Sequence, residues 1–297
     1  MGELIKVEHL TKRYDDFALR DASLCVESGR VVGLIGSNGA GKTTMLKAIL
    51  GLISVDEGEI SLFGIDSGKS RHAAQHDIDS VKERIGVVFD TCAFLTTMRI
   101  KDVESLGRAS YSKWDSALFS NLCEKFDLGF KKQVKDLSRG MGMKLTLAFA
   151  LAHHPDILIL DEATAGLDPM ARDEILDILR DFMSDETRGI LMASHITTDL
   201  EKIADEVVCI DNGSILFSMS KEAICDEVGI MRCRKSDIER LQSAGWAKGE
   251  LKILSHEYGI DVLVPDRFAF ASEFEDIPVE RASIEEYMAL TLKGESL

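Results

Sequence analysis

The segment that decides the fold is Gly36-Ser37-Asn38-Gly39-Ala40-Gly41-Lys42-Thr43. It matches the pattern G-x-x-x-x-G-K-[S/T], in which glycines let successive backbone N–H groups point into one concavity. An apolar run at 31–35 precedes it and a helical pattern at 43–50 follows it, which is the context that the pattern requires. A chance glycine-rich turn is the alternative, and the flanking elements disfavour it. The segment therefore predicts a phosphate-binding loop between a strand and a helix.

The chemistry of this loop points to a nucleotide and its metal ion. The N-terminus of the following helix adds partial positive charge where a phosphate would lie. Lys42 is placed to reach the β- and γ-phosphates, and the Thr43 hydroxyl to ligate Mg²⁺. We expect nucleotide contacts from Gly36, Ser37, Asn38, Gly39, Ala40, Gly41, Lys42, Thr43 and Thr44.

A second apolar run, at 157–160, leads directly into the acidic pair Asp161 and Glu162. Two carboxylates at the end of a buried strand are costly unless a cation lies nearby. Mg²⁺ on a bound nucleotide would supply that charge, with Asp161 acting through the metal. Glu162 would then polarise the attacking water. The alternative is that the pair is only the polar start of a loop.

Short apolar runs at 31–35, 157–160, 190–193 and 207–210 predict buried parallel strands. Because helical patterns alternate with these runs, the first 218 or so residues predict an α/β fold with a mostly parallel sheet. A helical insertion is expected at about 91–150. Within it, four apolar residues recur at helical spacing: Trp114, Leu118, Leu122 and Phe126.

The composition changes beyond about Ser220. Two S-x-x-E patterns, Ser236 with Glu239 and Ser283 with Glu286, match capping boxes and each predicts the start of a helix. The run 260–264 is typical of a strand, and Pro265 would end it. We expect one domain at 1–218 and a small α+β appendage at 219–297.

Charge and composition exclude several classes of protein. The 297-residue chain has 35 basic and 51 acidic residues, a net charge of −16, which argues against binding to nucleic acid. No apolar run is long enough to span a membrane, and the N-terminus lacks the pattern of a signal peptide. The six cysteines are scattered without a C-x-x-C pair and are expected to be reduced core thiols of a cytoplasmic protein.

Three further motifs complete a recognisable set. They are Leu137-Ser138-Arg139-Gly140-Met141, Ala165-Gly166-Leu167-Asp168, and His195 after the run 190–193. In this order and spacing, residues 3–218 resemble the nucleotide-binding subunit of an ATP-binding cassette (ABC) transporter. The resemblance implies a P-loop NTPase fold of the ABC ATPase type, with a mostly parallel core sheet, an antiparallel β part and a helical insertion.

The resemblance also implies roles for single residues. Tyr14 matches the aromatic residue that stacks on adenine, although an ordinary half-buried tyrosine is the alternative. His195 matches the switch histidine that contacts the γ-phosphate, and Asp168 belongs to the loop that crosses between subunits. Together with Lys42 and Glu162, His195 would be catalytic.

Two motifs depart from the family pattern. The residue after 87–89 is usually Gln, and Asp90 stands there, where it could ligate Mg²⁺ beside Thr43 and Asp161 or weaken phosphate binding. The family signature reads Leu-Ser-Gly-Gly-Gln and acts on the nucleotide of the other subunit. Here Arg139 and Met141 replace Gly and Gln, while Ser138 and Gly140 remain.

The function that this resemblance implies is hydrolysis of ATP, with Mg²⁺, to drive a separate membrane permease. Similarity to bacterial drug- and lantibiotic-exporter ATPases implies export, from a position on the inner face of the cell membrane. Two ATPase chains would pair, as a homodimer or a heterodimer. Two alternatives are a soluble ABC-type switch acting on a cytosolic partner and a P-loop kinase, which would leave the signature, Asp168 and His195 unexplained.

Overall fold

A computed structural model describes residues 2–66, 80–244, 251–257 and 259–296. The chain forms two compact units. Unit 1 comprises Met1–Ala204 and Val208–Ser218, and unit 2 comprises Asp205–Val207 and Met219–Leu297. Each is described by itself below. This division does not show what unit 2 does, so an accessory role for unit 2 stays a prediction.

A six-stranded sheet forms the centre of unit 1, in the order β10-β9-β3-β8-β7-β6. Its strands are β3 (Val31–Ile35), β6 (Ile85–Val88), β7 (Ile157–Asp161), β8 (Gly189–Ser194), β9 (Glu206–Asp211) and β10 (Ser214–Ser220). The pairs β3–β8 and β8–β7 are parallel, as predicted for such apolar runs, and β6, which was not predicted, pairs parallel with β7. Because parallel strands end at the same edge, the segments after β3, β6, β7 and β8 are brought together there.

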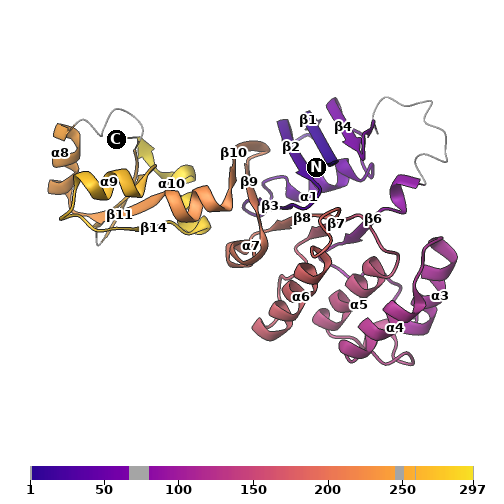
Figure 1. The fold of residues 1–297 in the computed structure, drawn as a ribbon. Coiled ribbons are helices and arrows are strands. Elements are labelled where there is room, and N and C mark those ends of the chain that lie inside the picture. The colour runs from indigo at the N-terminus through magenta and orange to yellow at the C-terminus, as the bar shows by residue number, and fades with distance from the viewer. Residues whose placement is uncertain (1, 67–79, 245–250, 258, 297) are drawn as a thin grey trace. The chain divides into compact units, whose positions relative to one another are not determined.

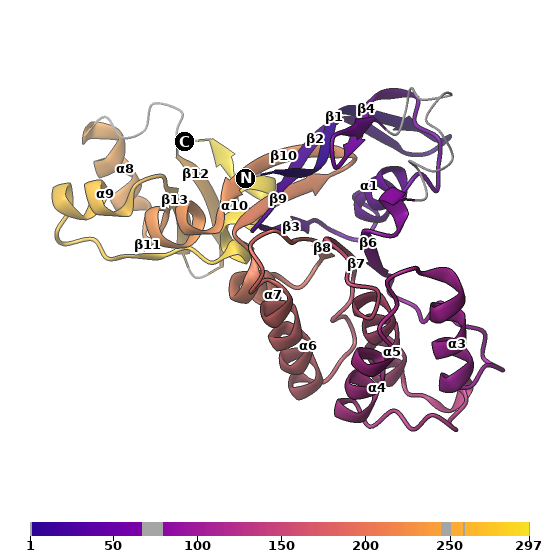
Figure 2. The same ribbon diagram turned by 45° about the vertical axis from the view of Figure 1, so that its right-hand side comes forward.

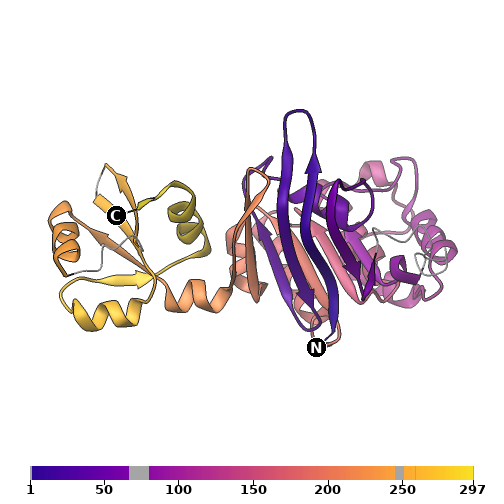
Figure 3. The ribbon, with the colours of Figure 1, turned by 90° about the horizontal axis from the view of Figure 1, so that it is seen from above.

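An antiparallel sheet lies above the core sheet, with α1 between them (Figures 1 and 3). Its order is β2-β1-β4-β5, from β1 (Glu3–Arg13), β2 (Ala18–Glu27), β4 (Glu57–Leu62) and β5 (Ile65–Asp66). Helix α1 (Lys42–Ile49) buries Met45, Leu46 and Ile49 in one hydrophobic cluster with residues of both sheets. This packing holds the start of α1 at the edge where the parallel strands end.

The remaining helices of unit 1 lie on the other side of the core sheet (Figure 2). They are α3 (Ile100–Ser110), α4 (Ser116–Lys125), α5 (Arg139–Leu151), α6 (Pro169–Phe182) and α7 (Thr197–Ile203), with a short 3₁₀ turn at Val134–Asp136. The helical segment that the spacing of apolar residues predicted at about 91–150 is present. Phe119 and Cys123 are fully buried, whereas Leu118 and Leu122 are only partly buried.

Unit 2 has a five-stranded sheet in the order β14-β11-β13-β12-β15. Its elements are β11 (Gly229–Cys233), α8 (Lys235–Ala244), β12 (Lys252–His256), β13 (Gly259–Val264), α9 (Arg267–Glu273), β14 (Val279–Arg281), α10 (Ile284–Lys293) and β15 (Glu295–Ser296), after a single π-helical turn at Ala223–Glu227. Two hydrophobic clusters bury residues of these strands, one with α8 and α9 and the other with α10. This is the α+β arrangement predicted.

One of the two predicted capping boxes is confirmed. The Ser283 hydroxyl accepts a hydrogen bond from the backbone N–H of Glu286, and the Glu286 carboxylate accepts one from the Ser283 backbone, at the start of α10. The box at Ser236 is wrong, because α8 already begins at Lys235 and Asp237 accepts from the backbone N–H of Arg234 instead. A carboxylate one residue further along has taken the capping role.

None of the helices in the described part of the chain is long and apolar enough to cross a membrane. The six cysteines form no disulfide. Cys123, Cys209 and Cys233 are buried as predicted, and burial raises the pKa of the Cys123 and Cys209 thiols to about 12. Cys25 is exposed, so the prediction of core thiols is wrong for that residue.

Candidate functional site

The loop at 36–43 connects β3 to α1 and depends on glycine at particular positions. Gly41 precedes α1 with a φ of 118°, and Gly39 has a φ of 84°, both in the left-handed region. A Cβ on Gly41 would lie 2.9 Å from the Phe17 ring, and one on Gly36 would lie 2.3 Å from the carbonyl oxygen of Ile210. The loop can therefore curl closely against the ends of its neighbours only because these residues lack side chains.

Lys42 is buried at the first position of α1. Its Nζ donates to the carbonyl oxygens of Gly36 at 2.7 Å and Ser37 at 3.3 Å, and lies 3.4 Å from Oε1 of Glu162. The ammonium group thus spans the mouth of the loop. It forms an ion pair with Glu162, which directly follows β7.

Asp161, at the end of β7, is 4% exposed. Its Oδ2 accepts a hydrogen bond from the Thr43 hydroxyl at 2.8 Å, while Oδ1 is buried without a hydrogen-bond partner among the described residues. Burial raises the pKa of Asp161; the Thr43 hydrogen bond opposes this rise, and the negative charges of Glu162 and Asp90 add to it. An unpartnered carboxylate oxygen beside a hydroxyl is the donor set that Mg²⁺ prefers.

The described residues do not hold a metal by side chains alone. Among them, no three His, Cys, Asp or Glu side chains are grouped as metal ligands. Mg²⁺ usually takes one or two protein ligands and completes its shell with waters and phosphate oxygens. Thr43 and Asp161 fit such a partial site. Asp90 lies close enough to act on the charge of Asp161, but no direct contact joins the two carboxylates.

Glu162 has a φ of 53°, a left-handed conformation that costs a residue with a side chain about 1 kcal/mol. This conformation accompanies a close contact between Oε2 of Glu162 and Nδ1 of His195, at 2.6 Å. The backbone N–H of His195 points to the same oxygen at 3.4 Å. Local strain of this kind is concentrated at functional sites, where it holds a side chain in a fixed orientation.

A cavity of about 290 Å³ lies over the loop, with Glu162 and Asp90 on its wall. Its other lining residues are Phe17, Ser37, Asn38, Gly39, Gly41, Lys42, Thr43 and Thr44. Phe17 was not anticipated from the sequence. Tyr14, the predicted adenine-stacking residue, is not among the lining residues; its ring is 48% exposed and lies 6.5 Å from the Phe17 ring, centroid to centroid.

The signature segment, defined as residues 137–141, opens α5. Ser138 caps the helix, its hydroxyl accepting from the backbone N–H of Met141 at 3.2 Å. The Arg139 guanidinium lies against Gly166, where a Cβ would meet its NH1 atom at 3.0 Å. A Cβ on Gly140 would lie 3.2 Å from the Leu167 side chain. The signature segment and the loop before α6 therefore form a second group of predicted site residues.

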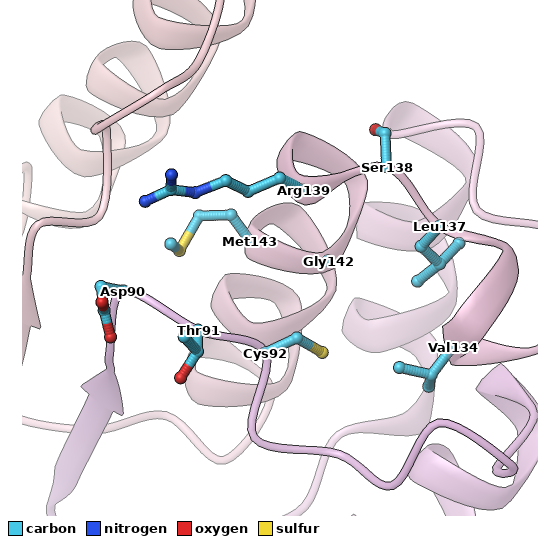
Figure 4. A pocket seen from close by; sticks show the side chains of 9 residues that line it. All are labelled: Asp90, Thr91, Cys92, Val134, Leu137, Ser138, Arg139, Gly142 and Met143. Atoms are coloured by element: carbon cyan, nitrogen blue, oxygen red, sulfur yellow. The ribbon is translucent and has the colours of Figure 1, made fainter.

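A larger cavity, about 410 Å³, lies beside this second group (Figure 4). Asp90, Thr91 and Cys92 line it from the loop after β6, and Val134, Leu137, Ser138, Arg139, Gly142 and Met143 from the other side. In Figure 4, Arg139 and Met143 extend from α5 toward the side on which Asp90 lies. Asp90 lines both cavities, so it is the residue common to the two groups.

Asp168 belongs to the second group because it directly follows Gly166 and Leu167, which lie against the signature segment. It caps α6, and its Oδ1 accepts from the backbone N–H of Ala171 at 3.0 Å. The structure thus brings Lys42, Thr43, Asp161, Glu162 and His195 together at one edge of the core sheet. Ser138, Arg139, Gly140 and Asp168 line no part of the 290 Å³ cavity in the described chain.

Comparisons with known proteins identify the family. Residues 19–165 match the family model described as "ABC transporter". The chain is 32% identical over 235 residues to the ABC transporter ATP-binding protein NatA of Bacillus subtilis (strain 168), a match that covers 74% of this chain and 91% of NatA. This chain is an ABC transporter ATPase.

Other relatives of this ATPase are also named as ATP-binding proteins. It is 38% identical over 237 residues to the Nod factor export ATP-binding protein I of Burkholderia thailandensis, covering 76% of this chain and 74% of that protein. A solved structure described as a dimeric post-hydrolysis state of the ATP-binding cassette MJ0796, bound to ADP and Pi, superposes with a TM-score of 0.64 at 20% identity, covering 73% of this chain and 99% of that one. The last likeness concerns the fold alone.

Family membership establishes that the chain binds and hydrolyses ATP as a subunit of a transporter. The P-loop ABC ATPase fold predicted from the motifs is confirmed. The family model covers the phosphate-binding loop, the signature segment and the acidic pair, but not Tyr14, Asp168 or His195. The individual roles of the site residues are therefore proposals, taken up below.

Proposed function

We propose that this ATPase powers export through a separately encoded membrane permease, on the inner face of the cell membrane, as a dimer with ATP at the subunit seam. The observation that carries the proposal is the separation of the two groups of site residues. The loop, the acidic pair and His195 surround one cavity, whereas Ser138 and Gly140 line no part of it. Because the signature residues line no part of the nucleotide cavity of their own chain, a second chain would complete each site.

In the proposed dimer, each ATP lies on the phosphate-binding loop of one chain and under the signature segment of the other. Backbone N–H groups at 36–44 bind the phosphates, Phe17 or Tyr14 packs against the adenine, and Thr43 and Asp161 hold Mg²⁺ with Asp90 beside them. The N-terminus of α5, with Ser138, Arg139, Gly140 and Met141, would face the γ-phosphate in trans. Asp168 would cross the seam. A homodimer is the simplest arrangement, and a heterodimer with a related ATPase is the alternative.

The geometry of Glu162 suggests how binding and hydrolysis are linked. Its Oε1 is 3.4 Å from the Lys42 ammonium and its Oε2 contacts His195. A γ-phosphate would attract Lys42 and leave Oε1 available to accept a proton from the attacking water. The water oxygen bonds to the γ-phosphorus as the bond to the β-phosphate oxygen breaks, and phosphate and ADP leave. Mg²⁺ supplies charge neutralisation on the phosphates.

Export and the permease partner are supported by the relatives. The Nod factor protein is named as an export subunit, and NatA is named as the ATP-binding protein of a transporter. Leu95, 71% exposed in the segment after Asp90, provides an apolar side chain where a permease would dock. Closing the dimer would pull on that segment, and hydrolysis would release it.

Light scattering of the Glu162→Gln protein, with and without Mg-ATP, tests the dimer. Loss of the carboxylate should block hydrolysis and trap the closed form, so we expect an ATP-dependent shift from monomer to dimer. A protein that binds Mg-ATP and stays monomeric would rule out closure of this chain with itself. Adding ADP in place of ATP is the control, because it lacks the γ-phosphate that the signature segment would contact.

Membrane fractionation tests the transport proposal. The full chain, in cells that normally make it, should sediment with membranes and be released by alkaline carbonate, as a peripheral subunit would be. Cross-linking through a cysteine placed at Leu95 should yield an adduct with a multi-span membrane protein. An ATPase that stays in the soluble fraction and forms no such adduct would contradict the proposal while leaving ATP hydrolysis intact.

A further inference from the structure

The two helices that follow the proposed site loops are joined by an ion pair with unusual geometry. Arg172 lies in α6, four residues after Asp168, and Asp199 lies in the first turn of α7, four residues after His195. Nε of Arg172 is 3.7 Å from Oδ2 of Asp199. The pair therefore joins the helix behind the Asp168 loop to the helix behind the His195 loop.

Asp199 and the Nε atom of Arg172 are buried, and the pair is incompletely bonded. Asp199 is 1% exposed, yet neither of its carboxylate oxygens has a hydrogen-bond partner among the described residues, and the buried Nε of Arg172 has none either. A separation of 3.7 Å is too long for an N–H···O hydrogen bond. Three buried polar atoms of this pair therefore lack hydrogen bonds. Such an arrangement costs free energy unless the pair has a function or tightens in another state.

The contacts of α6 and α7 connect this pair to the Asp168 loop and to His195. Asp168 caps α6, and Lys144 of the signature helix α5 contacts Glu174 of α6 at 2.5 Å. On the other side, α7 follows His195, whose ring contacts Glu162. A shift of less than about 1 Å between α6 and α7 would bring Arg172 and Asp199 to hydrogen-bond distance. Such a shift would change the position of His195 relative to Glu162.

We propose that Arg172 and Asp199 are positioning residues for ATP hydrolysis, coupling the Asp168 loop to the orientation of His195. The inference rests on the proposed roles of Glu162 and His195. When the partner's nucleotide or signature segment moves the Asp168 loop, α6 carries Arg172 toward Asp199 and the pair sets the start of α7. The nucleotide cavity itself contains neither residue.

The chain offers a matched control. Lys202 of α7 and Asp173 of α6 form a second ion pair between the same two helices, at 2.7 Å, but both side chains are about half exposed, at 46% and 59%. Exposed pairs of this kind contribute little. If any ion pair between α6 and α7 could position His195, variants of the two pairs would change kcat equally.

The test is a double-mutant cycle on the full-length protein, with kcat and KM for ATP and the thermal midpoint of each variant. Asp199→Asn, which keeps the shape and removes the charge, should lower kcat about 10-fold or more. KM for ATP should change less than about twofold, because binding does not use this pair. Arg172→Gln should act in the same direction, and the double variant should be no slower than the slower single variant.

The control variants and His195→Ala separate the outcomes. Asp173→Asn and Lys202→Gln should leave kcat within about twofold of the unmodified protein. A folded Asp199→Asn protein with normal kcat, or an equal loss at the control pair, would overturn the inference; because Asn fills the same volume, this variant decides even if Arg172→Gln fails to fold. If His195→Ala itself hydrolyses ATP normally, the proposed role of His195 has failed instead.

Discussion

The carboxylate Oε2 of Glu162 lies 2.6 Å from Nδ1 of His195, although 33 positions separate the two residues in the chain. The contact arises because β7 and β8 are neighbouring parallel strands, with Asp161 opposite Ala193, so the residues that follow them emerge together. An ionised carboxylate only accepts hydrogen bonds, so Nδ1 carries the proton of this contact. The sheet thereby fixes both the tautomer and the direction of the histidine ring.

Replacing the carboxylate tests its proposed role as the base. We expect Glu162→Gln to lower kcat by about 10²- to 10⁴-fold, the contribution typical of a positioned general base. ATP should still bind, because the loop and Lys42 are intact. Phosphate release and nucleotide titration measure the two quantities separately. Glu57→Gln, which removes an exposed ion pair with Arg13, is the control and should hydrolyse ATP normally.

Gly41→Ala tests the conformation of the phosphate-binding loop. The new methyl group would meet the Phe17 ring at 2.9 Å while the backbone holds a φ of 118°, so we expect at least a 10-fold loss of ATP affinity, about 1.4 kcal/mol. Gly51→Ala is the matched comparison, since it also has a positive φ, 65°, but its Cβ would meet nothing within 4 Å. Equal losses of affinity in both variants would show that the loop geometry is not responsible.

Ser138→Ala separates helix capping from catalysis. Removing a cap costs about 1 kcal/mol of stability. If the hydroxyl also faces the partner's γ-phosphate, this variant should in addition lose about 10-fold or more in hydrolysis while keeping its ATP affinity. Ser283→Ala removes an equivalent cap from α10 in unit 2 and should lower stability alone. Normal hydrolysis by Ser138→Ala would limit that residue to capping.

His153 predicts a pH-dependent stability. The residue is 1% exposed, its Nε2–H donates to the carbonyl oxygen of Ile85, and its ring stacks on Tyr111 with 4.0 Å between centroids. Burial lowers the pKa of His153 below its usual 6.5, so the native ring stays neutral when the unfolded chain takes up a proton. Stability should therefore fall as the pH drops from about 7 to 5.

Urea unfolding at both pH values measures this effect. We expect His153→Gln to show less loss between pH 7 and pH 5 than the unmodified protein, by about 1 kcal/mol. His256→Gln, which replaces an exposed histidine of unit 2, is the matched comparison. An identical dependence in the His153→Gln protein would show that other groups control acid sensitivity.

Strong local patterns predicted most of the fold. The apolar runs that became β3, β7 and β8 are fully buried along their length, so their pattern depends little on context. The helical spacing predicted the insertion but not its boundaries, since Trp114 lies before α4 begins at Ser116. Its ring instead packs against Gly107, where a Cβ would meet it at 2.4 Å.

The nucleotide cavity was predicted less completely than its phosphate-binding part. Phosphate contacts come from one continuous segment, which a sequence displays directly. Phe17 reaches the cavity from the turn between β1 and β2, three residues after Tyr14, and no local pattern marks which of the two rings enters. The Arg172–Asp199 pair was missed for a similar reason, since only the packing of α6 on α7 brings its charges together.

Because Asp90 lines both cavities, its charge should affect whether ATP binds with or without a magnesium ion. With Asp161 and Glu162, Asp90 gives this edge of the sheet three carboxylates beside the Lys42 ammonium. A bare triphosphate would bring still more negative charge into that field, whereas its magnesium complex brings two charges fewer. We therefore expect the site to discriminate between metal-free and metal-bound ATP more sharply than one with a neutral amide at position 90, so that divalent ion supply, rather than nucleotide supply, sets its occupancy.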